Sequence, residues 1–228
     1  EADAVSAELT SKNIAAQALV NVYATAPYVD EKYWSTFFRK ADCLENPPHA
    51  PFEGLSDFMK AAQISQVDMV ARVKREMQRE THYSATHPAL KDRIKALSPD
   101  DVLPETLKTS AAEAWLSKNY PVVLKHFDSI WLENNQERWN KRFQYVTTAK
   151  AALASFSGKE PGELSNDELW DFASYTYEFS GDEAALPLYE AYQGRNPESI
   201  GAAYYIGKIL MDQEKEECLS HLRIAFKS

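Results

Sequence analysis

The feature that most constrains the fold is a stretch near the end of the chain that repeats after 34 residues. Shifting the segment 169–192 by this period aligns aromatic, aliphatic and small residues with residues of the same kind. The aligned pairs are Trp170 with Tyr204, Phe172 with Ile206, Ala173 with Gly207, Ala184 with Cys218, Leu188 with Leu222, Ala191 with Ala225 and Tyr192 with Phe226. Two antiparallel helices approach closely only where side chains are small, so the period predicts two stacked helical hairpins.

This pattern resembles the tetratricopeptide (TPR) repeat, in which a Leu-Gly pair, an alanine and a phenylalanine recur at fixed places. Asn196-Pro197 resembles the proline that ends that repeat. Three departures are Leu169 or Ala203 at the usual tryptophan position, Thr176 or Leu210 at the usual tyrosine position, and a turn inside the repeat that is one residue short. The resemblance implies two TPR-like units preceded by an atypical helix pair over residues 110–160. The alternative is a plain pair of helical hairpins with a chance period.

Composition supports a helical fold and argues against some partners. Glycine is scarce, at 7 of 228 residues, against a usual share of about 7%. Few glycines, together with many Ala, Leu, Glu and Lys, predict an all-α protein. The net charge of −9 argues against nucleic acid as a partner, because phosphate binding needs a basic stripe. No apolar run approaches the ~18 residues of a membrane span, so no span is expected in this sequence.

Proline-containing breaks divide the first half into predicted helices. Small or apolar residues recur at helical spacing at Ala4, Ala7, Ile14, Ala18 and Val22. Pro27 is expected to end this helix and Asp30 to cap the next one. The break between Pro99 and Pro104 predicts a domain boundary near residue 108, which gives domains 1–108 and 109–228. A long helix in the second domain carries Trp139, Phe143, Val146, Leu153 and Phe156 on one face.

Motifs for self-contained catalysis are missing from the sequence. None of its five histidines belongs to a His-Glu-x-x-His motif, and its glycines are dispersed rather than gathered in a phosphate-binding loop. Neither Cys43 nor Cys218 has a neighbour at zinc-binding or redox spacing. No metal site and no cofactor are therefore expected within this chain, which should be catalytically silent by itself.

Two short motifs nevertheless point to one enzyme family. The first is Glu-Ala-Asp-Ala at residues 1–4, and the second is Thr-His-Pro followed by an arginine at residues 86–93. In this order they resemble the M-forty-eight zinc metallopeptidases, the group that includes HtpX and the CAAX prenyl protease. That family binds zinc through a His-Glu-x-x-His helix and a glutamate in a later Glu-x-x-Ala-Asp pattern. Ala2-Asp3 match the end of this pattern, so the resemblance implies a ligand glutamate two residues before Glu1, outside this sequence.

The resemblance also implies roles for individual residues. His87 would lie at the rim of the zinc cleft and donate a hydrogen bond to the oxyanion that forms on the substrate. Arg93 would support that segment or reach the cleft, and Asp3 would orient the metal ligands. Taken without the family, the same residues fit an ordinary helix start, a loop histidine and a solvated arginine. Zinc is expected in the longer parent protein and not in this chain.

The sequence is thus interpreted as a fragment of a zinc metalloendopeptidase with a TPR-like region for protein or peptide binding. The candidate groove residues are Trp170, Tyr177, Tyr204 and Met211. The remainder of the peptidase domain is a second expected partner. The alternative is a standalone TPR adaptor without a catalytic parent.

Both ends of the chain are interpreted as cut points. No capping residue precedes the first helix, and the last apolar-periodic segment stops at Ser228. The fragment is expected to be soluble, whereas the parent protein is expected to be associated with the inner membrane. The absence of a disulfide framework favours the cytoplasmic face.

Overall fold

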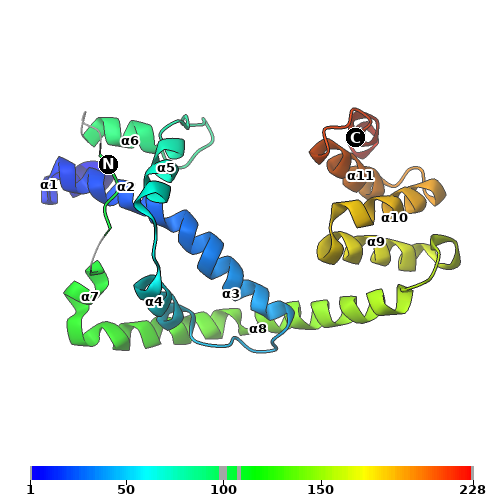
Figure 1. Cartoon of the computed structure of the whole chain (residues 1–228), viewed down its shortest axis with the longest axis horizontal. Coiled ribbons are helices and arrows are strands. Elements are labelled where there is room, and N and C mark those ends of the chain that lie inside the picture. The colour runs from blue at the N-terminus through cyan, green and yellow to red at the C-terminus, as the bar shows by residue number, and fades with distance from the viewer. Residues whose placement is uncertain (1, 98–101, 107–108, 227–228) are drawn as a thin grey trace. The chain divides into compact units, whose positions relative to one another are not determined.

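The computed structural model describes residues 2–97, 102–106 and 109–226 of the chain. Every regular element among them is helical, so the all-α prediction is confirmed (Figure 1). The chain divides into two compact units, residues 1–141 and 142–228. The division falls inside one long helix, α8 (Tyr120–Phe156). None of the helices in the described ranges combines the length and apolarity that a membrane crossing needs.

The first unit contains the helices that precede α8 together with the first part of α8. Their bounds are α1 (Ala2–Leu9), α2 (Lys12–Val29), α3 (Ser35–Arg39), α4 (Pro51–Ala61), α5 (Gln66–Glu76), α6 (Leu90–Leu97) and α7 (Ala111–Leu116). Short segments of other helix types are η1 (Asp30–Trp34, π), η2 (Lys40–Asp42, 3-10) and η3 (Ser117–Asn119, 3-10).

The prediction that Pro27 ends the first long helix is wrong. Pro27 lies inside α2, and the π-helical segment η1 carries the helix on into α3 (Figure 1). The backbone N–H of Ser35 donates to the carbonyl oxygen of Asp30, which is the wider spacing of a π turn. Pro27 lacks a backbone N–H and so costs one hydrogen bond to the preceding turn, but the helical backbone continues past it. Asp30 has helical backbone angles and is the first residue of η1, so it does not provide the predicted N-terminal cap of the next helix.

The core of the first unit forms where α2 packs against α5 and α6. The buried residues are Ala15, Ala16, Val20 and Ala24 from α2, Met69 and Val73 from α5, and Leu90, Ile94 and Leu97 from α6. Small side chains on α2 allow both neighbours to approach closely. The residues that revealed this helix in the sequence, Ile14, Ala18 and Val22, lie on its exposed side. Helix α2 therefore has two apolar sides. One packs against α5 and α6, and the other is exposed.

Helix α4 is capped by a side chain that lies far away in sequence. The residue before it provides no side-chain cap. Instead, the buried carboxylate of Asp128 on α8 accepts hydrogen bonds from the backbone N–H groups of Phe52 at 2.7 Å and Glu53 at 3.2 Å. A carboxylate at this position satisfies N–H groups that have no partner within the helix and complements the helix dipole. Asp128 thereby attaches α4 to the first part of α8.

A second attachment of α8 is the side chain of Trp139. Its indole N–H donates to the carbonyl oxygen of Leu44 at 2.8 Å, and its ring lies 5.4 Å from that of Phe37 between centroids. Both rings are buried. These contacts explain why the first unit extends to residue 141, whereas the sequence predicted a boundary near residue 108.

The second unit is a series of helices in which each packs against the next. Its elements are the last part of α8, η4 (Pro161–Glu163), α9 (Asn166–Ser180), α10 (Asp182–Arg195), α11 (Ile200–Asp212) and α12 (Cys218–Ala225). Ser165 and Glu168 form a reciprocal capping box that starts α9. Gly181 alone joins α9 to α10, with a φ of 92° that a side chain would strain.

The 34-residue period is also a structural period in the first helix of each pair. Helices α9 and α11 begin 34 residues apart, at Asn166 and Ile200. The same three positions are buried in both: Leu169 and Ala203, Ala173 and Gly207, Thr176 and Leu210. The small residue Gly207 lies at a close helix approach, because an added Cβ would lie 2.8 Å from Leu222 Cδ2. In the second helices the predicted pairing of Ala184 with Cys218 is wrong, since Ala184 is exposed and Cys218 is buried.

Candidate functional site

Asp3 on α1 and Arg93 on α6 form a two-pronged ion pair. Nε of Arg93 donates to Oδ2 of Asp3 at 2.7 Å, and Nη2 donates to Oδ1 at 2.6 Å. The two side chains are mostly buried, with 28% of Asp3 and 21% of Arg93 exposed. A bidentate pair in partial burial is stronger and more specific than a surface salt bridge. It fixes the first turn of α1 against α6.

The ion pair determines the charge state of both partners. The hydrogen bond from Arg93 lowers the pKa of the Asp3 carboxyl, and the charges of Arg93 and His87 act in the same direction. Conversely, the hydrogen bond to Asp3 raises the pKa of Arg93, and a further hydrogen bond to Tyr23 adds to this effect. At neutral pH the carboxylate and the guanidinium both remain charged. Because neither group changes its charge, the pair can hold α1 against α6 but does not act as an acid or a base.

His87 lies in the exposed segment that leads into α6. Thr81 holds this segment in place, because its Oγ1 accepts from the backbone N–H of Ala89 at 2.7 Å and donates to Asp92 at 2.6 Å. A positively charged His87 adds the weakest of the influences that lower the pKa of the Asp3 carboxyl. The structure therefore brings Asp3 and Arg93 into direct contact, and His87 belongs to their neighbourhood through the segment that leads into α6.

Tyr23 and Thr81 are members of this neighbourhood that the sequence did not indicate. Tyr23 belongs to a long helix whose residues all looked like ordinary core or surface positions. Thr81 lies nine residues before Leu90, the first residue of α6, which is too far for a local capping rule to find it. Only the tertiary arrangement identifies either residue.

The neighbourhood does not by itself fit a metal ion. Both carboxylate oxygens of Asp3 accept hydrogen bonds from Arg93, so they are already engaged. In the part of the chain that the structure describes, no three His, Cys, Asp or Glu side chains gather in a way that could hold a metal. No chemical step is therefore assigned to a metal held by these residues.

The four groove candidates of the second unit separate into a covered pair and an exposed pair. Trp170 is partly buried, and its ring lies against Tyr205 and against the backbone of Gly201. Tyr177 is also partly buried, since its ring lies 5.2 Å from that of Tyr205. In contrast, Tyr204 and Met211 are exposed. The second pair is therefore more accessible to a partner than the first.

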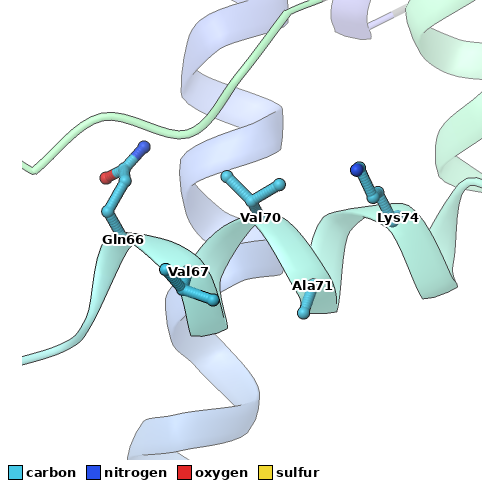
Figure 2. A pocket seen from close by; sticks show the side chains of 5 residues that line it. All are labelled: Gln66, Val67, Val70, Ala71 and Lys74. Atoms are coloured by element: carbon cyan, nitrogen blue, oxygen red, sulfur yellow. The ribbon is translucent and has the colours of Figure 1, made fainter.

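A shallow hollow of about 330 Å³ runs along α5 in the first unit. It is lined by Gln66, Val67, Val70, Ala71 and Lys74 (Figure 2). Lys74 is its one titratable lining residue, so the hollow does not hold a set of acid, base and nucleophile. Gln66 has a structural task there, because its side-chain amide donates to the carbonyl oxygen of Pro104 at 2.6 Å.

The neighbourhood of Asp3, His87 and Arg93 is thus the strongest candidate site in the first unit. It combines a partly buried ion pair, an exposed histidine and a loop fixed by Thr81. No family model, curated protein or solved structure matches this chain. A functional assignment consequently depends on the motifs and on the contacts between their residues.

Proposed function

We propose that this chain is the C-terminal helical region of an M-forty-eight zinc metallopeptidase, joined to a TPR-like region that binds protein. One observation carries the first part. Asp3 and Arg93 come from two separate motifs, 90 residues apart, and their side chains form a bidentate ion pair. The charge of His87, from the second motif, acts on the same carboxyl. The contact supports the proposal, because the resemblance implies that both motifs lie at one zinc cleft.

In the proposed enzyme the ion pair is a positioning device. The Arg93 guanidinium holds Asp3 and with it the first turn of α1, next to which the ligand glutamate of the family would lie. His87 is exposed and would donate a hydrogen bond to the oxyanion of the substrate. Zinc and the residues that would bind it belong to the part of the parent protein outside this sequence. The roles proposed here are therefore limited to positioning and hydrogen bonding.

An exposed apolar side of α1 and α2 supports a further covering domain. Val5 and Leu9 on α1 and Ile14 and Val22 on α2 are all exposed. The opposite side of α2 is already packed against α5 and α6. Burial of such side chains stabilises a protein by about 1.5–3 kcal/mol each when complete. On this proposal the remainder of the peptidase domain covers them, and the parent protein is associated with the inner membrane at its cytoplasmic face.

The role of His87 can be tested in the parent peptidase with His87→Ala. Loss of one oxyanion donor is expected to lower kcat by about 10²–10³-fold, with a much smaller rise in KM because the contact forms in the transition state. His82→Ala is the matched control, since His82 is an exposed histidine of the same loop. It should leave kcat unchanged. An unchanged kcat in His87→Ala would contradict the proposed hydrogen bond to the oxyanion and leave His87 as an ordinary loop residue.

The second candidate function is that of a standalone TPR-like adaptor, which the exposed Tyr204 and Met211 favour. The residues encoded upstream of Glu1 discriminate between the two. A His-Glu-x-x-His motif followed by a glutamate shortly before Glu1 supports the peptidase. A translation start within a few residues of Glu1 would exclude the peptidase and leave the adaptor.

A further inference from the structure

Residues 102–106, which lie between α6 and α7 in the sequence, form a non-helical segment that contacts two helices of the first unit. Val102 packs against the core formed by α2, α5 and α6, and the side chain of Pro104 is fully buried. Leu103, between them, is 57% exposed, and Glu105 is also exposed. This alternation of covered and exposed residues is that of an extended backbone.

Two side-chain amides of α2 bind the backbone of the segment. Nε2 of Gln17 donates to the carbonyl oxygen of Leu103 at 2.7 Å, and Oδ1 of Asn21 accepts from the backbone N–H of Glu105 at 2.8 Å. The two amides lie one helical turn apart, and Nε2 of Gln17 also donates to Oδ1 of Asn21 at 3.1 Å. Because this last bond lies within α2, it orients both amides toward a peptide backbone in advance.

A third amide reaches the segment from α5. Nε2 of Gln66, the first residue of α5, donates to the carbonyl oxygen of Pro104 at 2.6 Å. In Figure 2 this nitrogen points toward the pale green trace of the segment. The proline ring fixes its own φ and disfavours a helical conformation of the residue before it. The segment therefore loses little conformational entropy when it binds in the extended form.

Contacts of this kind are those by which proteins recognise extended peptides. The backbone of such a peptide forms hydrogen bonds with its receptor, and pockets take alternate side chains. The amides of Asn and Gln offer both a donor and an acceptor, as the edge of a β-strand does. Here the bound features are the backbone of residues 103–105, the ring of Pro104 and the apolar residue two positions before it. The exposed side chains of Leu103 and Glu105 can vary without loss of these contacts.

We propose that α2 and α5 form a binding site for an extended peptide with an apolar residue two positions before a proline, and that residues 102–106 occupy this site as an intramolecular ligand. The segment seated on the two helices identifies the class of ligand. Its covalent tether gives it an effective concentration of about millimolar. A free peptide of the same chemistry therefore enters only when the chain's own segment is weakened. The proposal does not depend on the peptidase or the TPR assignment.

The proposal can be tested with the full chain and a capped peptide of residues 102–106. Binding is followed by NMR through the side-chain NH₂ signals of Gln17 and Gln66. Pro104→Gly in the chain removes the buried ring and frees the backbone, so the variant should bind the peptide about tenfold more tightly than the wild type does. A peptide that carries Pro104→Gly should not bind. A peptide that carries Leu103→Ala should bind with unchanged affinity, because this side chain is exposed.

A second substitution tests the site itself. In the Pro104→Gly chain, Gln66→Leu removes the donor to the proline carbonyl and should weaken peptide binding by up to about tenfold. Gln63→Leu is the matched control, since Gln63 is an exposed glutamine three residues earlier. It should leave the affinity unchanged. Melting temperatures establish that each variant is folded.

Hydrogen exchange of the wild-type chain gives a measurement that needs no variant. The backbone N–H of Glu105 should exchange about tenfold or more slowly than in the unfolded chain, because Asn21 accepts its hydrogen bond. Exchange at the unfolded rate would overturn the proposal. A folded Pro104→Gly chain that binds the peptide no more tightly than the wild type would overturn it as well. Neither measurement involves kcat of the parent enzyme, so failure here is distinguishable from failure of the peptidase proposal.

Discussion

Each of the two units is stabilised internally by contacts of a different range in sequence. In the second unit each helix packs against its neighbour in sequence, and one period of 34 residues describes the first helix of both pairs. In the first unit the decisive contacts join distant residues, such as Asp3 with Arg93 and Asp128 with the start of α4. Local order is visible in a sequence, whereas distant pairing is visible only in three dimensions.

This difference has a consequence for stability. A repeat unit depends on the interface between successive helices, so damage at one interface spreads to its neighbours. A unit stabilised by contacts between residues far apart in sequence depends on a few anchoring side chains. No neighbouring contact compensates for the loss of one of them. Substitutions at one anchor and at one repeat interface should therefore destabilise different parts of the chain.

Trp139→Ala is expected to have the largest effect. The change removes a buried ring that contacts Phe37 and an indole hydrogen bond to Leu44. Truncation of a buried tryptophan costs about 3–5 kcal/mol of unfolding free energy. Hydrogen exchange should show faster opening of α3 and α4 but not of α11.

Trp115→Ala is the control for this substitution. Trp115 is 89% exposed in the same unit, so its truncation should change stability by less than about 0.5 kcal/mol. An equal loss of protection in α11 and α4 after Trp139→Ala would contradict the division into two units.

Gly207→Ala is expected to destabilise the second unit by about 1–3 kcal/mol through overpacking. The new methyl group would lie 2.8 Å from Cδ2 and Cγ of Leu222 and 3.2 Å from its backbone nitrogen, which cannot move without shifting α12. Thermal denaturation with residue-level exchange in α11 and α12 measures the effect.

Gly194→Ala provides a control of opposite sign. Gly194 is also helical, but an added Cβ there meets no atom within 4 Å. Alanine should stabilise this helix by up to about 1 kcal/mol, because it restricts the unfolded chain more than glycine does. If Gly207→Ala were stabilising as well, α11 and α12 could not approach each other as closely as the structure shows.

Sequence reasoning succeeded where a pattern repeats locally. The all-α class followed from composition, the long helix over Trp139 and Phe156 from apolar spacing, and the buried small pair Ala173 and Gly207 from the 34-residue period. For α2, spacing revealed a helix but not its covered side. Ile14 and Val22 formed as good an apolar stripe as Val20 and Ala24, and only the packing of α5 and α6 distinguishes them.

The candidate site was predictable to the extent that a family motif names its residues. Asp3, His87 and Arg93 were found in this way, and the ion pair then connected two of them. Asp128 had no comparable signal, because an aspartate within a helix usually faces solvent. Its cap on α4 requires a partner 75 or 76 residues away. No rule based on neighbouring residues can find such a contact.

Asp3→Asn is expected to have the smallest of the three effects, with a characteristic pH dependence. Asparagine keeps one acceptor oxygen for Arg93 but removes the charge of a partly exposed pair, so the change should cost about 1 kcal/mol at neutral pH. The pKa of Asp3 is lowered in the folded state from its ordinary value of 3.8, mainly by the hydrogen bond from Arg93. The stabilisation is therefore fully present above the unfolded pKa and is lost as the pH falls through the folded pKa.

Denaturant titrations of wild type and Asp3→Asn between pH 7 and about pH 2 measure this dependence. The two curves should differ at neutral pH and converge below about pH 4 as the wild-type carboxyl becomes protonated. Glu137→Gln is the control, because Glu137 pairs with Lys141 on the surface of α8, with 81% of its side chain exposed. That pair should contribute little to stability, because water and salt screen two exposed charges. A constant difference between wild type and Asp3→Asn at all pH values would show that the carboxylate charge does not hold α1 to α6.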